Sequence, residues 1–242
     1  RTENLDIPSN TTILFAPGAV LKGTDDYNDT PLLYVNNSSN VRFAGLGTID
    51  VNALTEVNTN TKIHGIDWNN DSHNQVVEDL LFRDSKSWML HVKRSKDVYF
   101  NNLKIFSGKD GVDPDGVTNM KVENSTIVSI DDGFAVKSKR EGYDTRNVII
   151  RDNIVMSAAS NLKIGTENYF GVIENVTFDN IKVLNGDRGA ILYTNEKGNA
   201  DVKNITWQNI YIENFAWDNR GEGSPFQLLH ATGDKRDYEM EN

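Results

Sequence analysis

Short runs of alternating apolar and polar residues recur along the chain at a nearly constant spacing. The copies are "DVYFNNLKIFS" from Asp97, "NMKVENSTIVS" from Asn119, "NVIIRDNIVMS" from Asn147, "NVTFDNIKVLN" from Asn175 and "NITWQNIYIEN" from Asn204. The first interval is the shortest, and the three that follow are almost equal. Because apolar residues alternate within each half, each copy predicts two short strands joined at an Asn or Asp turn.

A repeat of roughly 20–30 residues is typical of a solenoid. We therefore expect an all-β fold, a right-handed parallel β-helix in which each repeat forms one coil that stacks on the previous one. Stacked strands lie about 4.8 Å apart. The segments "TTILFAPGAVLKG" and "NVRFAGLGTIDVN" indicate two further coils upstream. An all-β sandwich is the alternative architecture, but it does not predict the period.

The pattern predicts a single domain over residues 1–242, since we find no linker or low-complexity segment. A chain of this length can bury a sizeable core. The first residues enter a strand almost at once, and the last, "GDKRDYEMEN", show no helix-forming cap. Because a solenoid needs its open ends covered, we expect a β-helix that lacks one or both end caps.

Composition narrows the setting and the partners. Cysteine is absent, so packing and backbone pairing must hold the fold without disulfides. The net charge of −10, with Lys and Arg spread along the chain, argues against a nucleic-acid or membrane partner. Eight Asn-x-Ser/Thr sequons, among them Asn10, Asn70 and Asn175, favour a secreted or periplasmic location. We expect a monomer.

Five aspartates gather between residues 108 and 138, namely Asp110, Asp113, Asp115, Asp131 and Asp132. Asp132 follows Asp110 by the same interval that separates the copies at Asp97 and Asn119, which is one coil, so Asp110 is expected beside Asp131 and Asp132. Crowded carboxylates raise at least one pKa. Such a set suits glycosidic bond cleavage, in which one carboxylic acid protonates the leaving oxygen and another carboxylate activates water. For Asp113 and Asp115, capping of backbone N–H groups in turns is the favoured interpretation.

The segments "DGVDPDG", "DDGFAVKS" and "NLKIGTENYFGVIENV" resemble, in order and spacing, the motifs of family 28 glycoside hydrolases, the polygalacturonase-like pectin-degrading enzymes. Flanking segments such as "SWMLHVKRSKDVYFNNLKI" and "RGAILYTNEKG" extend the resemblance over nearly the whole chain. The resemblance implies a parallel β-helix and an inverting hydrolysis with Asp110, Asp131 and Asp132 as the catalytic carboxylates. It further implies that Asp132 is the general acid and that the other two hold and activate water.

The chain departs from the family pattern at two places. Ser160 stands where the family has a His that supports the acid, and Ile191, Leu192 and Tyr193 stand where it has Arg-Ile-Lys contacting a uronate carboxylate. Because Arg and Lys suit a sugar carboxylate, a neutral or differently charged glycan stays open, as in the related dextranase and isopullulanase family. Tyr193 either stacks on a sugar ring or only lines the groove wall.

Further substrate-binding candidates surround the carboxylates: Lys137, Lys163, Glu167, His91 and Arg188. A lysine at position 137 would keep a neighbouring base ionised. Lys163 and Glu167 fall on the following coil. The resemblance places a His next to the groove in the segment of His91, for which a structural role is the alternative.

Metal and cofactor motifs are missing from the sequence. His64, His73 and His230 form no zinc spacing. The stretch "DPDG" lacks the bidentate Glu of a calcium loop. We predict neither a metal nor an organic cofactor.

These observations predict an inverting glycoside hydrolase that cleaves a polysaccharide or oligosaccharide in an open groove. The alternatives are a non-catalytic carbohydrate-binding β-helix and a polysaccharide lyase, which would need calcium and a basic residue. The segment "HGIDWNNDSHNQ", residues 64–75, is a candidate loop that closes one end of the groove.

Overall fold

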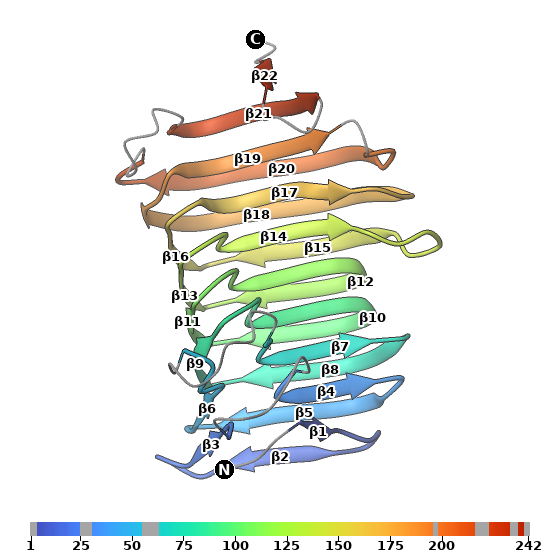
Figure 1. Cartoon of the computed structure of the whole chain (residues 1–242), viewed down its shortest axis with the longest axis vertical. Helices are drawn as coiled ribbons and strands as arrows, with labels where there is room; N and C mark the ends of the chain where they lie inside the picture. The colour runs from blue at the N-terminus through green and yellow to red at the C-terminus, as the bar shows by residue number, and fades with distance from the viewer. Residues whose placement is uncertain are drawn as a thin grey trace.

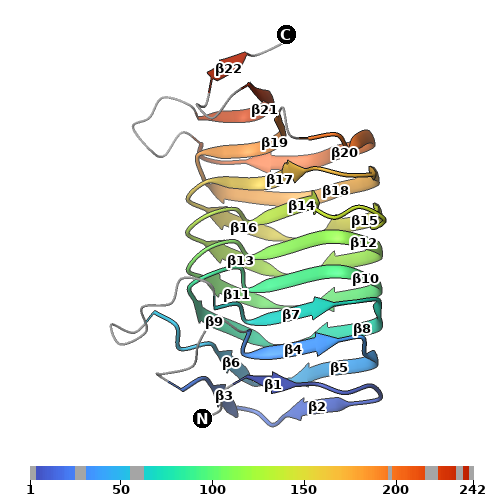
Figure 2. The same cartoon turned by 45° about the vertical axis from the view of Figure 1, so that its right-hand side comes forward.

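The computed structural model describes residues 4–24, 31–54, 63–195, 198–215, 223–232 and 237–239. The described strands stack as successive coils of one long column, from the N-terminal end to the C-terminal end (Figure 1). The predicted parallel β-helix is confirmed. The coils form three parallel sheets that enclose the core (Figure 2). Each coil thus contributes three strands, whereas the sequence repeat predicted two.

The first sheet carries the residues of interest for function. Its strands are β1 (Leu5–Asp6), β4 (Leu33–Asn36), β7 (Ile66–Asn69), the first halves of β10 (Leu90–Asn101) and β12 (Val112–Glu123), β14 (Phe134–Ser138), β17 (Ser160–Asn168), β19 (Arg188–Asn195) and β21 (Ser224–Thr232). A last strand, β22 (Asp237–Glu239), pairs antiparallel with β21.

The other two sheets correspond to the repeat seen in the sequence. The second sheet holds β2 (Thr12–Phe15), β5 (Ser39–Gly45), β8 (Ser72–Glu78), the second halves of β10 and β12, β15 (Thr145–Arg151), the first half of β18 (Val172–Asn185) and β20 (Asp201–Ile212). The third holds β3 (Val20–Lys22), β6 (Thr48–Asp50), β9 (Leu81–Ser85), β11 (Lys104–Ser107), β13 (Thr126–Ser129), β16 (Ile154–Ser157) and the ends of β18 and β20.

Rows of register-paired apolar side chains fill the interior. One row in the first sheet is Ile66, Leu90, Val112, Phe134 and Leu162, all fully buried. A row in the second sheet is Phe43, Val77, Phe100, Val122, Ile150 and Phe178. Each such side chain contributes roughly 1.5–3 kcal/mol of burial free energy. A slip of one residue would turn these rows outward, so the core fixes the register.

A ladder of side-chain amides runs along the bends where each coil passes from the first sheet to the second. Asn119, Asn147, Asn175 and Asn204 each donate a side-chain hydrogen bond to the Asp or Asn oxygen one coil earlier, at 3.0–3.2 Å, starting from Asp97. All five residues have left-handed backbone with φ between 53° and 59°. Asn and Asp tolerate this conformation better than other residues with a Cβ. The ladder therefore explains why each sequence repeat begins with Asn or Asp.

One turn is longer than its counterpart on the preceding coil. Asp115 of β12 pairs with Lys137 near the end of β14, and Thr118 of the same strand pairs with Arg146 at the start of β15. The six additional residues lie between β14 and β15 and leave the stacking on both sides intact. This segment, residues 139–144, is called the long turn below.

The predicted groove-closing loop at residues 64–75 is wrong. Most of this segment forms β7 and β8, and the Trp68 side chain is fully buried and donates a hydrogen bond to Gln75 at 3.2 Å. Its apolar content belongs to the core. The expected lack of end caps concerns residues at the ends of the chain, of which 1–3 and 240–242 lie outside the described part. Nowhere in the described ranges is there a helix with the length and hydrophobicity needed to span a bilayer.

Replacing Asn147 by Ala should lower the free energy of unfolding by about 1–3 kcal/mol, measured by urea denaturation. The change removes two ladder hydrogen bonds and places an ordinary side chain at a left-handed position, which costs about 1–2 kcal/mol. Asn147→Gly is the control, because it removes the same hydrogen bonds but accepts the backbone conformation. An equal loss in both variants would show that the left-handed backbone contributes nothing to the preference for Asn.

Candidate active site

Three carboxylates meet at the start of the first-sheet strands. Asp110 lies in the turn between β11 and β12, and Asp131 and Asp132 lie in the turn between β13 and β14, one coil further. One oxygen of each lies within 4.8 Å of the other two. The Asp132 backbone N–H also donates to Asp110 Oδ1 at 3.4 Å. Asp110 and Asp132 are only 3% and 4% exposed, whereas Asp131 is half-buried.

Asp132 is held as a carboxylate. Lys163 Nζ lies 2.6 Å from its Oδ2, and the Ser160 backbone N–H donates to its Oδ1 at 3.1 Å. Burial by itself raises the pKa of Asp132, but the Lys163 ammonium outweighs it and brings that pKa below its ordinary value. Burial lowers and Asp132 raises the pKa of Lys163, with a net increase. The pair therefore stays ionised near neutral pH.

Asp131 has the opposite electrostatics. Burial, followed by the negative charges of Asp132 and Asp110, raises the pKa of Asp131 to about 6. The pKa values of the neighbouring Asp131 and Asp132 carboxyls are thus shifted in opposite directions. Such a difference identifies the acid and the base of a catalytic pair. The family resemblance implies Asp132 as the acid, whereas these electrostatics favour Asp131 as the proton donor.

Lys137, on β14, lies at the centre of a second group of acids. Its Nζ is 2.5 Å from Asp113 Oδ1, 3.2 Å from Asp110 Oδ2 and 3.6 Å from Glu167 Oε2. Burial lowers the pKa of Lys137, but Asp113 and Asp110 outweigh it and hold that pKa well above its usual range. Burial raises the pKa of Asp113 well above its ordinary value. One buried ammonium therefore serves several carboxyls, Asp110 among them.

The capping role expected for two aspartates holds for one of them. Asp115 accepts a hydrogen bond from the Lys139 backbone N–H at 2.9 Å. Asp113 is fully buried and contacts the Lys137 ammonium instead. The turn-like sequence "DPDG" did not indicate this buried contact.

A cavity of about 400 Å³ opens beside the three carboxylates. Its lining includes Asp131, Asp132, Lys163, Tyr193 and Arg188. The Lys163 ammonium lies 5.7 Å from the centre of the Tyr193 ring. Of the residues at the family's basic positions, Ile191 is fully buried and only Tyr193 reaches this cavity.

His91 lies on β10, outside this first cavity. It lines a second cavity of about 270 Å³, together with Lys93, Arg94, Asp115, Lys139 and Arg140 among others. Its Nε2 is 3.5 Å from Asp115 Oδ2, and burial holds the pKa of His91 well below its usual range. This second cavity is called the basic cavity below.

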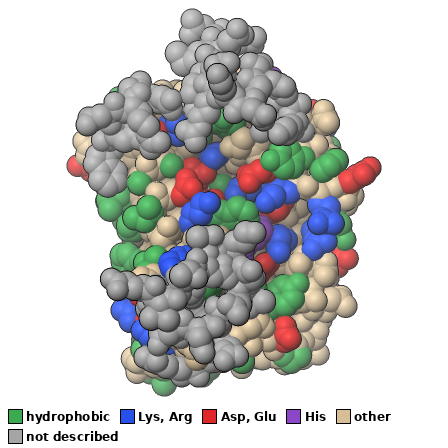
Figure 3. Space-filling model, viewed as in Figure 1, with side chains coloured by type: hydrophobic (Ala, Val, Ile, Leu, Met, Phe, Trp, Pro, Cys, Tyr) green, Lys and Arg blue, Asp and Glu red, His purple; other side chains and the backbone are tan. Residues whose placement is uncertain are grey.

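Trp88 contacts two residues of the basic cavity and, on the same ring, Lys137. The ammonium groups of Lys137 and Lys139 lie 4.0 and 4.7 Å from its ring centre, and the His91 ring packs edge-on against it at 4.5 Å. The sequence patterns did not point to Trp88, although it lies as far before Asp110 as Asp132 lies after it. Figure 3 shows Lys, Arg, Asp and Glu side chains gathered together on this face of the molecule.

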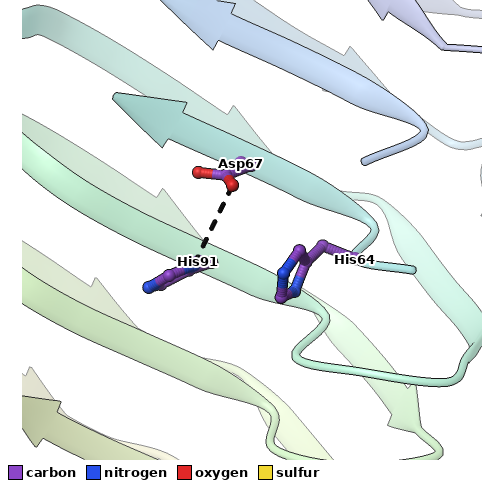
Figure 4. A group of neighbouring side chains, drawn as sticks. All are labelled: His64, Asp67 and His91. Atoms are coloured by element: carbon purple, nitrogen blue, oxygen red, sulfur yellow. Dashed lines mark ion pairs between the residues drawn. The ribbon is translucent and has the colours of Figure 1, made fainter. Parts of the chain in front are cut away.

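His64, Asp67 and His91 form a cluster that the sequence spacing did not reveal (Figure 4). Their potential ligand atoms lie within 4.8 Å of one another. However, Lys93 Nζ lies 2.7 Å from Asp67 Oδ2. Burial and the charge of Lys93 lower the pKa of His64 to about 4. The Lys93 ammonium thus already occupies the place beside Asp67 that a divalent cation would take, and the two positive charges would repel each other.

Comparison with known proteins gives a consistent family. The model of Glycosyl hydrolases family 28 matches residues 7–219. A probable polygalacturonase from Vitis vinifera is 28% identical over 153 residues, which cover 58% of this chain and 31% of that protein. Exopolygalacturonase B of Aspergillus niger is 28% identical over 160 residues, covering 57% and 34%. The chain thus matches about a third of the length of these relatives.

Solved structures share the fold. A hyperthermoactive exopolygalacturonase from Thermotoga maritima matches with a TM-score of 0.69 and 20% identity, covering 95% of this chain and 73% of that one. A polygalacturonase from Erwinia carotovora matches with a TM-score of 0.72 and 18% identity, covering 96% and 75%.

Lys137→Met should destabilise the protein by about 3–5 kcal/mol at pH 7, because it leaves Asp110 buried without its ammonium partner. Adding Asp110→Asn should recover part of that loss, since the amide carries no charge. Urea denaturation of the two variants and of Asp110→Asn alone measures the coupling. Strictly additive losses would contradict the ion-pair interpretation.

Proposed function

Because the chain belongs to family 28 of the glycosyl hydrolases, we propose that it hydrolyses a glycan bound along the first sheet. The observation that carries the proposal is the splitting of neighbouring carboxyls, with the pKa of Asp131 raised to about 6 and that of Asp132 lowered. Glycoside hydrolysis needs such a pair, one protonated and one ionised. Plant and fungal relatives named as polygalacturonases support a polysaccharide substrate.

In the proposed reaction Asp131 donates its proton to the glycosidic oxygen as the bond to the anomeric carbon breaks. Asp110 and Asp132 hold a water between them, and one accepts a proton as the water oxygen attacks the anomeric carbon. Lys163 Nζ, 2.6 Å from Asp132 Oδ2, keeps that carboxylate ionised, and Lys137 Nζ lies 3.2 Å from Asp110 Oδ2. After the step, the leaving sugar holds the proton from Asp131 as a new hydroxyl, and the base holds the proton taken from the water.

Inversion of the anomeric centre is part of the proposal. Inverting sites usually separate their carboxyls by about 6.5–9.5 Å and retaining sites by about 5–5.5 Å. The closest oxygens here lie within 4.8 Å, so this spacing does not support inversion, which rests on the family resemblance. Each oxygen of Asp110 and Asp132 accepts one hydrogen bond from an ammonium or backbone N–H group. These contacts disfavour direct attack because they reduce the nucleophilicity of the carboxylates, and they leave a second lone pair on each oxygen to accept from water.

A non-catalytic glycan-binding β-helix is the second candidate. The replacement of the family His by Ser160 and of its basic pair at residues 191–193 favours it. A binding surface, however, has no need for neighbouring carboxyls that titrate apart. Export and a monomeric state stay predictions.

Wild type should release reducing ends from one polysaccharide in a panel of neutral and acidic substrates. Asp131→Asn and Asp132→Asn should each reduce the rate by about 10²–10⁴-fold, because each removes a proton-transfer group. Asp201→Asn is the matched control, since Asp201 is exposed on β20 and pairs with Lys203.

The same reaction separates the alternatives. Glycan binding without hydrolysis by wild type would favour the binding module, and an unsaturated product lost on chelation would favour a lyase. The first anomer formed, observed by NMR, tests inversion directly.

The pH profile of kcat/KM should fall as the pH rises through about 6, because Asp131 must be protonated to act as the acid. Lys163→Met should move the acidic limb upward, since loss of the ammonium raises the pKa of Asp132, which must be ionised. Lys182→Met, on an exposed part of β18, serves as the control. An alkaline limb that stays at the same pH in Asp131→Asn would remove Asp131 from the acid role.

A further inference from the structure

Three copies of the sequence repeat end in serine, and these serines form a row inside the β-helix. Ser107 pairs in register with Ser129, and Ser129 with Ser157, at the last positions of β11, β13 and β16. All three are between 1% and 5% exposed. Two residues earlier, the same face of the sheet carries apolar core side chains such as Ile105 and Ile127. Hydroxyl groups buried beside such a core need hydrogen-bond partners.

The Ser107 hydroxyl binds the turn that carries Asp110. Its Oγ donates to the Asp110 backbone carbonyl at 2.7 Å and accepts from the Lys109 backbone N–H at 3.2 Å. Ser85 Oγ, on the preceding coil, lies 2.9 Å away and supplies the proton of that hydrogen bond, because the Ser107 hydroxyl has only one proton to donate. The Ser107 hydroxyl thus contacts the backbone before and after the Asp110 side chain.

Ser129 makes the corresponding contact one coil later. Its Oγ donates to the Asp131 backbone carbonyl at 3.2 Å. That carbonyl belongs to the peptide group that joins Asp131 to Asp132, so a rotation of this peptide would move both carboxyls. Among the described residues, none donates a hydrogen bond to the Asp131 carboxyl itself. The position of Asp131 therefore depends on its backbone.

Ser157 lacks this contact. Its Oγ is as deeply buried as the others but has no hydrogen-bond partner in the described part of the chain. The turn that follows it begins with two alanines and carries no carboxylate. Along this row, the two hydroxyls that precede an aspartate turn bind its backbone, and the hydroxyl without such a turn does not.

We propose that Ser107 and Ser129 are positioning residues of the hydrolase, whose hydroxyls fix the backbone of the two aspartate turns and so hold Asp110, Asp131 and Asp132 together. The inference rests on the proposed function. One oxygen of each carboxyl lies within 4.8 Å of the other two, and repulsion between them favours separation of the turns. A misplacement of about 1 Å can reduce a catalytic rate roughly 10²-fold. The two hydroxyls oppose that displacement.

Alanine variants of the row in the full chain test the proposal. Ser107→Ala and Ser129→Ala should each lower kcat about tenfold, because the carboxyls lose part of their alignment. KM should change less than about twofold, since neither serine lines the cavity beside the aspartates. Ser157→Ala is the matched control, with the same depth in the same row, and should keep the wild-type kcat.

Carbon-13 NMR titration of the Asp131 carboxyl adds a measurement that a loss of stability alone would not change. The charged groups around Asp131 are Asp132, Asp110, Lys163 and Lys109. Burial and the two carboxylates raise the pKa of Asp131 to about 6. In Ser129→Ala the loosened turn should let this carboxyl move toward water, so its pKa should fall by at least about 0.5. The alkaline limb of kcat/KM should move to lower pH with it.

Wild-type kcat and an unchanged Asp131 pKa in Ser129→Ala would overturn the positioning role of Ser129, and wild-type kcat in Ser107→Ala would overturn that of Ser107. An equal loss of kcat in Ser157→Ala would also overturn the proposal, because it would assign the effect to general packing of the row. Absence of hydrolysis by wild type on every substrate would refute the proposed function alone. The NMR titration does not depend on turnover and would still decide whether Ser129 holds its turn.

Discussion

The in-register stacking of parallel coils is the constraint on which the rest of this structure depends. Backbone hydrogen bonds between coils fix neighbouring strands about 4.8 Å apart, so a residue type that recurs after one coil meets its counterpart. For apolar side chains this repetition builds a continuous core, and for Asn it builds a ladder. For Asp110 and Asp132 it brings like charges together. The same rule that stabilises the fold therefore creates the electrostatic strain of the site.

Buried ammonium groups offset the repulsion between these carboxylates, and they do so for some carboxylates more than for others. Lys137 of β14 contacts Asp110, and Lys163 of β17 contacts Asp132, so each lysine comes from the coil after its aspartate. Asp131 has no comparably close ammonium contact in the described residues, and its pKa rises. The Lys163 ammonium thus separates the pKa values of Asp131 and Asp132, a difference that burial alone would not produce because burial raises the pKa of both.

Much of the fold and part of the site could be predicted from the sequence. The period gave the coils and the neighbouring positions of Asp110 and Asp132, because both follow from a fixed repeat. The strands of the first sheet were not predicted, since segments such as "VDPDGV" have no regular apolar alternation. The resemblance implies Asp132 as the proton donor, whereas charge and burial favour Asp131, and neither property is visible in a linear pattern. The contacts of Trp88 and the basic cavity were not predicted, because the residues involved come from different coils.

The long turn between β14 and β15 has a consequence for how such a protein can change. Its six additional residues include Lys139 and Arg140, which line the basic cavity, yet the strands on either side keep their register. The insertion is held at its two ends, where the Lys139 backbone N–H donates to Asp115 and the Val172 backbone N–H donates to Asp144. Substitutions at the exposed Arg140 between these ends should therefore alter surface chemistry with little effect on the core. The chemistry of this surface and the packing of the core therefore depend on separate segments, so substitutions in such turns can change the surface while the stacked strands stay the same.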